Sequence, residues 1–354
     1  MKKLIAASTA LLLAASLAAC GATGSSSSVA DSSAAVSTAS SSAATADSAA
    51  AGDSAAGKSY RVAIVQQLDH ASLDEIRTAA EAELDAKAAE QGITIEYTEF
   101  NGQNDATTLN QIGTQVVSDG YDAILPIATL AAQCMANATT DTDIPVVYAA
   151  ISDPAAAGVT DIANVTGTSD ALNTSFIMDM MFTASPDIKT VGLLYSNSEA
   201  NSTTPIAEAK KYLDGKGIAY VEKTGNTADE VLSAVASMTD QVDAVFTPTD
   251  NTIMASAAAV SESLAEAGIP YYTGADSFVT AGAFATCGVN YTELGAYTAD
   301  MLLDVLATGA YPEYHVMDGG IITINTDTAA ALGIDPTVFD SMDATVKPVT
   351  TSAD

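Results

Sequence analysis

From residue 60 onward, short apolar runs alternate with longer amphipathic stretches. Residues 61–66 (RVAIVQ) have the length and composition of a buried strand, and residues 73–91 repeat apolar positions at helical spacing until Gly92 stops them. Such a strand–helix alternation predicts βαβ crossovers, and therefore a parallel sheet with helices on both faces. This first unit continues with strands at 93–100, 123–126 and 145–149 and helices at 107–119 and 130–139.

The alternation starts again at residues 190–195 (TVGLLY). There is no strict sequence repeat, but the second unit is similar in size to the first. The pattern predicts an α/β fold made of two doubly wound parallel-sheet lobes joined by a hinge. The further helices of this half are expected at 204–216, 228–240, 252–267 and 294–307, and the strands at 218–223, 244–247, 270–273 and 320–325.

Each segment of residues 59–347 is assigned to one of the two lobes. Residues 59–168 and 277–317 are assigned to lobe I, and residues 169–276 and 318–347 to lobe II. Ligands of doubly wound sheets bind at the carboxyl ends of the strands. We therefore expect a small molecule to bind in a cleft between the lobes, which close around it by a hinge motion.

The N-terminus has the features of an export signal. Lys2 and Lys3 precede an apolar run from 4 to 19, which is shorter than the ~20 residues that span a bilayer, and the small residues before Cys20 suit a lipoprotein signal peptidase. Residues 1–20 are thus interpreted as a lipoprotein signal peptide with lipid on Cys20; an ordinary secretory signal is the alternative. Residues 21–58, rich in Ser and Ala, are expected to form a flexible linker.

Composition excludes several classes of function. The net charge of −32 argues against nucleic acid and anionic lipid as partners. With only His70 and His315 and no cysteine cluster, we expect no metal site and no cofactor. Cys134 and Cys287 are expected to be buried thiols rather than a disulfide. Neither a G-x-S-x-G nucleophile elbow nor a P-loop occurs, so we expect no enzyme activity.

Seven short motifs follow one another along the body. They are Ala128-Thr129 with Ala131-Ala132-Gln133, Ser152-Asp153-Pro154, Asn164-Val165-Thr166-Gly167, Leu194 to Asn201, Pro248-Thr249-Asp250-Asn251, Asp276-Ser277-Phe278-Val279, and Tyr291 to Gly295. In this order and spacing they resemble the tryptophan/tyrosine-type substrate-binding proteins of ABC importers. The chain departs from that family at Ser152, where Thr is more usual, and at Ala71 and Ser72, where Pro-Ala is usual.

The resemblance implies a type I periplasmic-binding-protein fold and an aromatic amino acid (Trp, Tyr or Phe) as ligand. It also implies ABC permease and ATPase subunits as partners. We expect a monomer located outside the cytoplasm and held at the cell membrane by its lipid anchor. Tyr148, Tyr195, Phe278 and Tyr291 are candidate walls for the aromatic side chain.

In lobe I, two residues after predicted strands are ligand-binding candidates. Thr129 lies at a helix start, where its hydroxyl and free backbone N–H groups can hold a carboxylate; plain helix capping is the alternative. Asp153 follows the strand at 145–149, and its alternative role is that of a turn residue before proline.

In lobe II, Glu199 and Asn201 occupy a polar loop after the strand at 190–195, where Glu199 accepts from the ligand or caps the next helix. Asp250, followed by Asn251, is the candidate acceptor for an ammonium group, because buried carboxylates need partners; its alternative role is a helix N-cap.

Two further candidates follow the strand at 270–273. Asp276 serves the site or the hinge, and Phe278 offers a ring for stacking or belongs to the core. Other cargoes on the same fold stay open: a nucleoside, because acidic residues suit ribose hydroxyls, or a branched-chain amino acid. A sugar is disfavoured because the chain has no Trp. A ligand sensor in place of an importer component also stays open.

Overall fold

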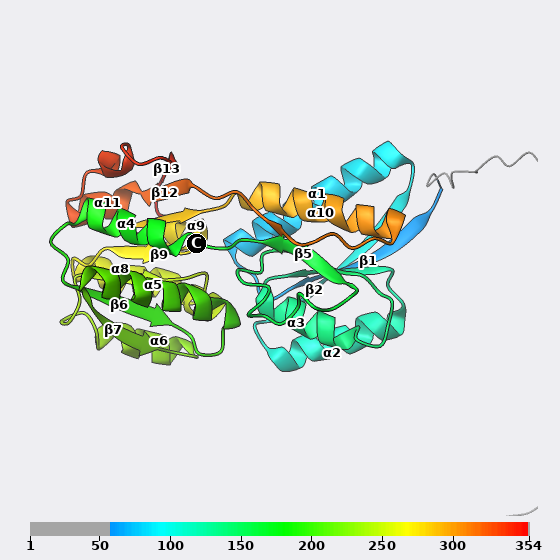
Figure 1. The fold of residues 1–354 in the computed structure, drawn as a ribbon, viewed down its shortest axis with the longest axis horizontal. Helices are drawn as coiled ribbons and strands as arrows, with labels where there is room; N and C mark the ends of the chain where they lie inside the picture. The colour runs from blue at the N-terminus through cyan, green and yellow to red at the C-terminus, as the bar shows by residue number, and fades with distance from the viewer. Residues whose placement is uncertain (1–56, 353–354) are drawn as a thin grey trace, which may run out of the picture. The chain divides into compact units, whose positions relative to one another are not determined.

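The computed structural model describes residues 57–352. Two sheets organise these residues (Figure 1). The first is a six-stranded parallel sheet, and with its helices we call it lobe I. Its strands, in the order β11-β5-β4-β3-β1-β2, are β11 (His315–Val316), β5 (Val165–Ser169), β4 (Val146–Tyr148), β3 (Ala123–Ile127), β1 (Ser59–Gln66) and β2 (Thr94–Asn101).

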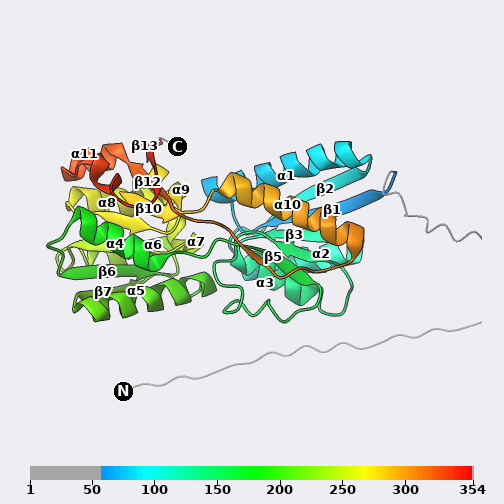
Figure 2. The same ribbon diagram turned by 45° about the horizontal axis from the view of Figure 1, so that its top comes forward.

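Strand β1 shows why lobe I has three layers. Val62 and Ile64 pack in one apolar cluster while Ala63 and Val65 pack in another, so both faces of the strand are buried. Figure 2 shows the helices on the two sides of this sheet. Helices α1 (Ala71–Gln91) and α10 (Tyr291–Thr308) cover one face, and α2 (Ala106–Asp119) and α3 (Thr129–Ala138) cover the other.

The second sheet has seven strands, of which only the β10–β12 pair is antiparallel. We call this sheet and its helices lobe II. Its strands, in the order β13-β12-β10-β9-β8-β6-β7, are β13 (Thr345–Val349), β12 (Ile321–Asn325), β10 (Ala285–Gly288), β9 (Tyr271–Thr273), β8 (Ala244–Thr247), β6 (Thr190–Tyr195) and β7 (Ala219–Thr224). Its helices are α4 (Thr174–Ala184), α5 (Thr203–Lys216), α6 (Ala228–Ala236), α7 (Asn251–Met254), α8 (Ala257–Glu266), α9 (Asp276–Thr280) and α11 (Thr326–Leu332).

The two-lobed α/β fold predicted from the sequence is confirmed. One lobe boundary was wrong: residues 277–288 belong to lobe II, because β10 pairs with β9 and β12 of that sheet. The single helix expected at 252–267 is two helices, because Ser256, at φ −123° and ψ 14°, interrupts the helix. The signal peptide, most of the linker and Cys20 lie outside the described residues.

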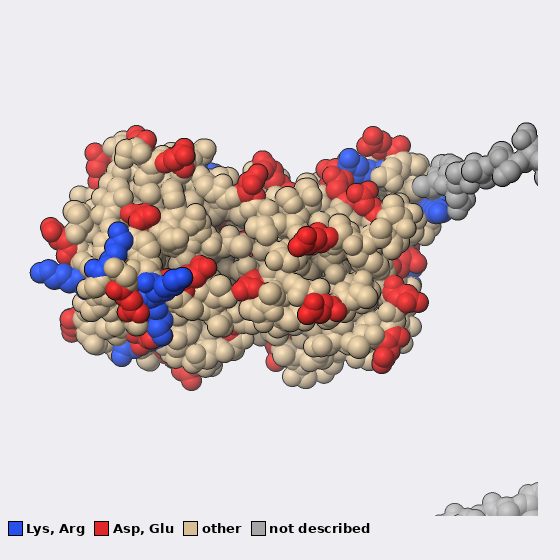
Figure 3. All heavy atoms as spheres, viewed as in Figure 1, with Lys and Arg blue, Asp and Glu red and all other residues tan. Residues whose placement is uncertain are grey.

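Other expectations concern the described part of the chain. Cys134 and Cys287 are free, buried thiols, as predicted. Within residues 57–352, no helix combines the length and apolar character needed to cross a bilayer. In the view of Figure 3, acidic side chains are spread over both lobes, whereas the basic side chains gather mainly on lobe II. In lobe II, Lys210 of α5 is paired with Glu222 at 2.8 Å.

Candidate ligand-binding site

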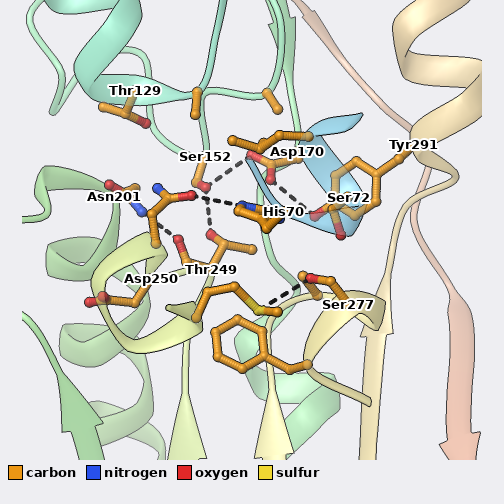
Figure 4. A pocket seen from close by; sticks show the side chains of 17 residues that line it. His70, Ser72, Thr129, Ser152, Asp170, Asn201, Thr249, Asp250, Ser277 and Tyr291 are labelled. Atoms are coloured by element: carbon orange, nitrogen blue, oxygen red, sulfur yellow. Dashed lines mark hydrogen bonds between the residues drawn. The ribbon is translucent and has the colours of Figure 1, made fainter. Parts of the chain in front are cut away.

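A small cavity of about 30 Å³ lies between the lobes and is lined by residues of both. Its walls come from residues just after the strands: Thr129 follows β3, Asp170 follows β5 and Thr249 follows β8 (Figure 4). The carboxyl ends of the two sheets therefore form the cavity, as the parallel topology predicts.

Helix α3 directs its N-terminal end toward this cavity. The helix begins at Thr129, after its N-cap residue Ala128, which has a backbone conformation of φ 75° and ψ 164° and makes no side-chain cap. Thr129 is thus the first residue of the helix rather than its N-cap. Gln67 Oε1 accepts from the Leu130 N–H at 2.9 Å, so one N–H of the first turn is already paired. The positive end of a helix favours an anionic group beside it.

A buried carboxylate, Asp170, lines the same cavity. It is 5% exposed and follows β5, where the chain leaves lobe I. The Ser152 hydroxyl donates to it at 2.9 Å and the Tyr291 hydroxyl at 3.4 Å. Burial raises its pKa, and no Lys or Arg of residues 57–352 lines the cavity. Asp170 therefore lacks a cationic partner, a costly state for a buried carboxylate that a cationic ligand would relieve.

Two further polar atoms at the cavity are buried without a hydrogen-bond partner. The Asn201 side-chain N–H donates to the Thr249 carbonyl at 2.5 Å, which fixes the amide and leaves Asn201 Oδ1 unpaired. His70 contacts Asn251 Oδ1 through Nε2 at 3.2 Å, and its Nδ1 is unpaired. Buried polar atoms are nearly always paired. The cavity therefore offers acceptors to a ligand that brings hydrogen-bond donors.

Direct hydrogen bonds join the two lobes around the cavity. Ser152 of lobe I and Thr249 of lobe II share a hydroxyl contact of 2.9 Å. Thr204 donates to Asp153 Oδ2 across the cleft at 2.6 Å. The His70–Asn251 contact is a third such link, so the lobes are closed on one another in this structure.

Five of the eight candidates from the sequence line the cavity: Thr129, Asn201, Asp250, Asn251 and Phe278. The role expected for Asp250 is not the one observed. Its Oδ2 accepts from the Ser196 N–H at 2.7 Å and from the Ser202 hydroxyl at 2.6 Å, and its Oδ1 accepts from the Ile253 N–H at 2.9 Å. Asp250 therefore caps α7 and ties down the loop after β6, the alternative that the sequence left open.

The other three candidates lie beside the cavity without lining it. Asp153 accepts from the Ala156 N–H as well as from Thr204, so it is a turn residue that also joins the lobes. Glu199 is buried and accepts from Asn251 Nδ2 at 3.0 Å. Asp276 begins α9 and accepts from the Ser72 hydroxyl at 3.3 Å, which places it at the hinge side.

Sequence reasoning did not identify His70 or Asp170 as site residues. Asp170 escaped because the strand before it, VTGTS, is too rich in Thr, Gly and Ser to be recognised as buried. Among the candidate wall residues, Phe278 and Tyr291 line the cavity. Tyr148 packs in the core of lobe I and Tyr195 against the core of lobe II, so neither faces the ligand space.

Residues 61–341 match the family described as ABC transporter substrate binding protein. The chain belongs to this family. The substrate-binding protein is 32% identical over 292 residues to a tyrosine-binding protein of Clostridioides difficile (strain R20291), covering 80% of this chain and 84% of that one.

Solved structures agree with this membership. The ABC domain from Streptococcus pneumonia in complex with L-Trp is 31% identical, with a TM-score of 0.75 over 82% of this chain and 100% of that one. A ligand-free, open substrate-binding protein with adhesive properties from Clostridium difficile is also 31% identical, with a TM-score of 0.63 over 83% of this chain and 100% of that one.

The resemblance read from the motifs is thereby confirmed, and the fold is that of type I periplasmic binding proteins. As a member of this family, the chain is an extracytoplasmic substrate-binding protein of an ABC transporter. Proteins of this kind are not enzymes.

The buried Glu199 predicts a pH dependence of stability. Burial, followed by the nearby charge of Asp250, raises the pKa of Glu199 from 4.5 to about 7. The folded protein thus holds a proton that the unfolded chain has released between these values, so the contribution of Glu199 to stability falls as pH rises through this window. Glu199→Gln has no such proton to lose. From about pH 5 to about pH 8, the melting temperature of the ligand-free wild type should fall by a few degrees relative to the variant. Parallel melting curves across this range would contradict the assignment.

Proposed function

We propose that this substrate-binding protein captures a free aromatic amino acid in the inter-lobe cavity and delivers it to an ABC importer. The observation that carries the proposal is Asp170, a buried carboxylate at the cavity with no cation among the lining residues. An α-ammonium group would neutralise this charge in the closed protein. Charge-assisted hydrogen bonds of this kind are about twice as strong as neutral ones.

Different protein groups in the cavity suit the ammonium and the carboxylate of an amino acid. Asp170 and the unpaired Asn201 Oδ1 accept hydrogen bonds and suit the ammonium group. The positive N-terminal end of α3 at Thr129 suits the carboxylate, helped by the hydroxyl of Thr249 from lobe II. Because these groups come from both lobes, a ligand holding both charges stabilises the closed form more than the open one.

The apolar part of the lining suits a large, flat side chain. Leu73 of α1, Met254 of α7, Phe278 of α9 and Tyr291 of α10 contribute to this wall. The ring of Phe278 also packs edge-on against Tyr271 at a centroid distance of 6.3 Å, which holds it in place. The names of the relatives, a tyrosine-binding protein and an L-Trp complex, support an aromatic amino acid as the cargo.

A thermal-shift panel tests this function. The protein without residues 1–57 should be stabilised by Tyr, Trp or Phe in proportion to affinity, because only the folded state binds the ligand. Adenosine, ribose and leucine are the comparison ligands, and N-acetyl-tyrosine, which lacks the ammonium charge, is the matched control. Stabilisation by adenosine or ribose and by no amino acid would contradict the proposed ligand and leave the fold assignment unchanged.

We also propose that the protein is anchored to the membrane through lipid on Cys20, behind the signal-like residues 1–19. A linker rich in Ser and Ala, residues 21–58, would then hold the lobes away from the bilayer. The lobes act by binding and release rather than by turnover, and we propose a monomer.

The anchor is tested by Cys20→Ala. Wild-type protein expressed in its full length should incorporate labelled fatty acid and sediment with membranes. The variant should lose both properties while its ligand-dependent thermal shift is unchanged, because the residues described as lining the cavity are the same in both proteins. Equal membrane retention of the two proteins would contradict lipidation at this residue.

A further inference from the structure

A chain of hydrogen bonds across the cleft fixes the protonation pattern of His70. The Asn251 side-chain nitrogen donates to Glu199 Oε2, at 3.0 Å. This orients the amide with Asn251 Oδ1 toward His70 Nε2, 3.2 Å away. An amide oxygen accepts only, so the proton of the neutral ring lies on Nε2. Burial lowers the pKa of His70, which keeps the ring neutral near pH 7.

The other ring nitrogen is left as an acceptor without a donor. His70 Nδ1 is buried and makes no hydrogen bond, although His70 lines the cavity and lies in the middle of the labelled side chains in Figure 4. An unpaired buried acceptor costs about 1–3 kcal/mol. A ligand that donates a hydrogen bond to Nδ1 recovers this loss, and a ligand that covers the atom with an apolar group does not.

The position of His70 associates this acceptor with the apolar wall rather than with the charged groups. His70 precedes α1, and Leu73 follows three residues later. Its partner Asn251 begins α7, and Met254 follows three residues later in that helix. Residues three apart at a helix start lie on one face, so the His70–Asn251 contact lies beside the apolar surface of Leu73 and Met254.

We propose that His70 Nδ1 accepts a hydrogen bond from the side chain of the ligand, and thereby selects aromatic amino acids that carry an O–H or N–H donor over phenylalanine. The proposal rests on the function proposed above. The acceptor is complete only when Asn251 of lobe II engages Nε2, so the selection takes place on closure. Tyrosine and tryptophan satisfy the atom, whereas phenylalanine leaves it unpaired.

Two variants separate the nitrogens of the ring. His70→Gln keeps a side-chain N–H at the distance of Nε2 and loses the acceptor at the position of Nδ1. His70→Asn places an amide oxygen at the position of Nδ1 and cannot reach Asn251. Affinities for Tyr, Trp and Phe are measured by calorimetry on the wild type and both variants.

The wild type should bind Tyr or Trp at least about tenfold more tightly than Phe. His70→Gln should reduce this ratio to within about threefold by weakening Tyr and Trp, with Phe little changed. His70→Asn should keep most of the ratio. If His70 serves only to link the two lobes, His70→Asn should lose affinity and His70→Gln should keep it. That result would overturn the proposal.

Other outcomes are also distinct. Equal weakening of Tyr and Phe in His70→Gln would show that Nδ1 meets the ammonium group, and equal wild-type affinities for Tyr, Trp and Phe would show that no donor is selected. Either result overturns this inference and leaves the proposed function standing. Absence of binding to all three amino acids in the wild type overturns both.

Discussion

Asp170→Asn should weaken the binding of an aromatic amino acid by about 2–5 kcal/mol, or roughly 30-fold or more, while the protein remains folded. The substitution keeps the shape of the side chain: the amide oxygen can still accept from one of the Ser152 and Tyr291 hydroxyls, and the amide nitrogen can donate to the other. It removes the negative charge that faces the ammonium group in this proposal, so the α-ammonium of the ligand would be buried without that counter-charge. Calorimetry at neutral pH measures the loss, and thermal unfolding without ligand confirms the fold.

A matched variant and a matched ligand make this result specific. Asp304→Asn removes one negative charge from the exposed side of α10, far along the helix from Tyr291, and should leave the affinity within about twofold. The ligand 3-(4-hydroxyphenyl)propionate lacks the ammonium group, so Asp170→Asn should not weaken its binding. If tyrosine and this analogue lose affinity equally, Asp170 supports the cavity structurally and does not meet the ammonium group.

Gly295→Ala should destabilise the protein, although alanine normally favours a helix. Gly295 lies in α10 where this helix crosses α1, and a Cβ there would be 2.4 Å from the Ile76 carbonyl oxygen and 2.9 Å from Ala79 Cβ. The obstacle is backbone, so the helices must separate within the core of lobe I. Overpacking of this kind costs about 1–3 kcal/mol, which corresponds to a melting temperature lower by about 2–5 °C.

Gly215→Ala in α5 is the control for this prediction. It is the same substitution in another helix, and no atom lies within 4 Å of the added Cβ. Reduced backbone entropy of the unfolded chain should stabilise this variant by up to about 1 kcal/mol. Opposite shifts of the two melting temperatures are expected. Shifts in the same direction would mean that helix propensity, rather than the α1–α10 contact, decides the effect at Gly295.

The elements that the sequence predicted well are those whose pattern is local. Strand β1 and helix α1 were placed within two residues of their observed bounds, because a run of apolar residues and a helical spacing ending at Gly92 are properties of the segment itself. Strand β5 was missed because Val165–Ser169 is buried by neighbours from other parts of the chain and not by its own composition.

The same distinction explains which site residues were found. Thr129 and Asp250 were proposed because they follow apolar strands and precede helices, and both do line the cavity. Their roles could not be predicted from the sequence. Asp250 accepts hydrogen bonds from Ser196 and Ser202, which lie about 50 residues before it in the sequence, so no local pattern indicates the contact. Asp170, rather than Asp250, is the carboxylate that a cationic ligand would neutralise. It was missed because the strand before it was not predicted from the sequence.

The sequence by itself determined two parallel α/β lobes with polar residues at their strand ends, because these follow from periodicity and from the chirality and connectivity of βαβ units. Only the tertiary structure decided which acidic side chains are satisfied within the protein and which face the cavity without a counter-charge. Hydrogen bonds between distant segments make that choice, such as Ser202 to Asp250 and Ser152 to Asp170. The burial that raises the free energy of an unpaired carboxylate exists only once both lobes surround it.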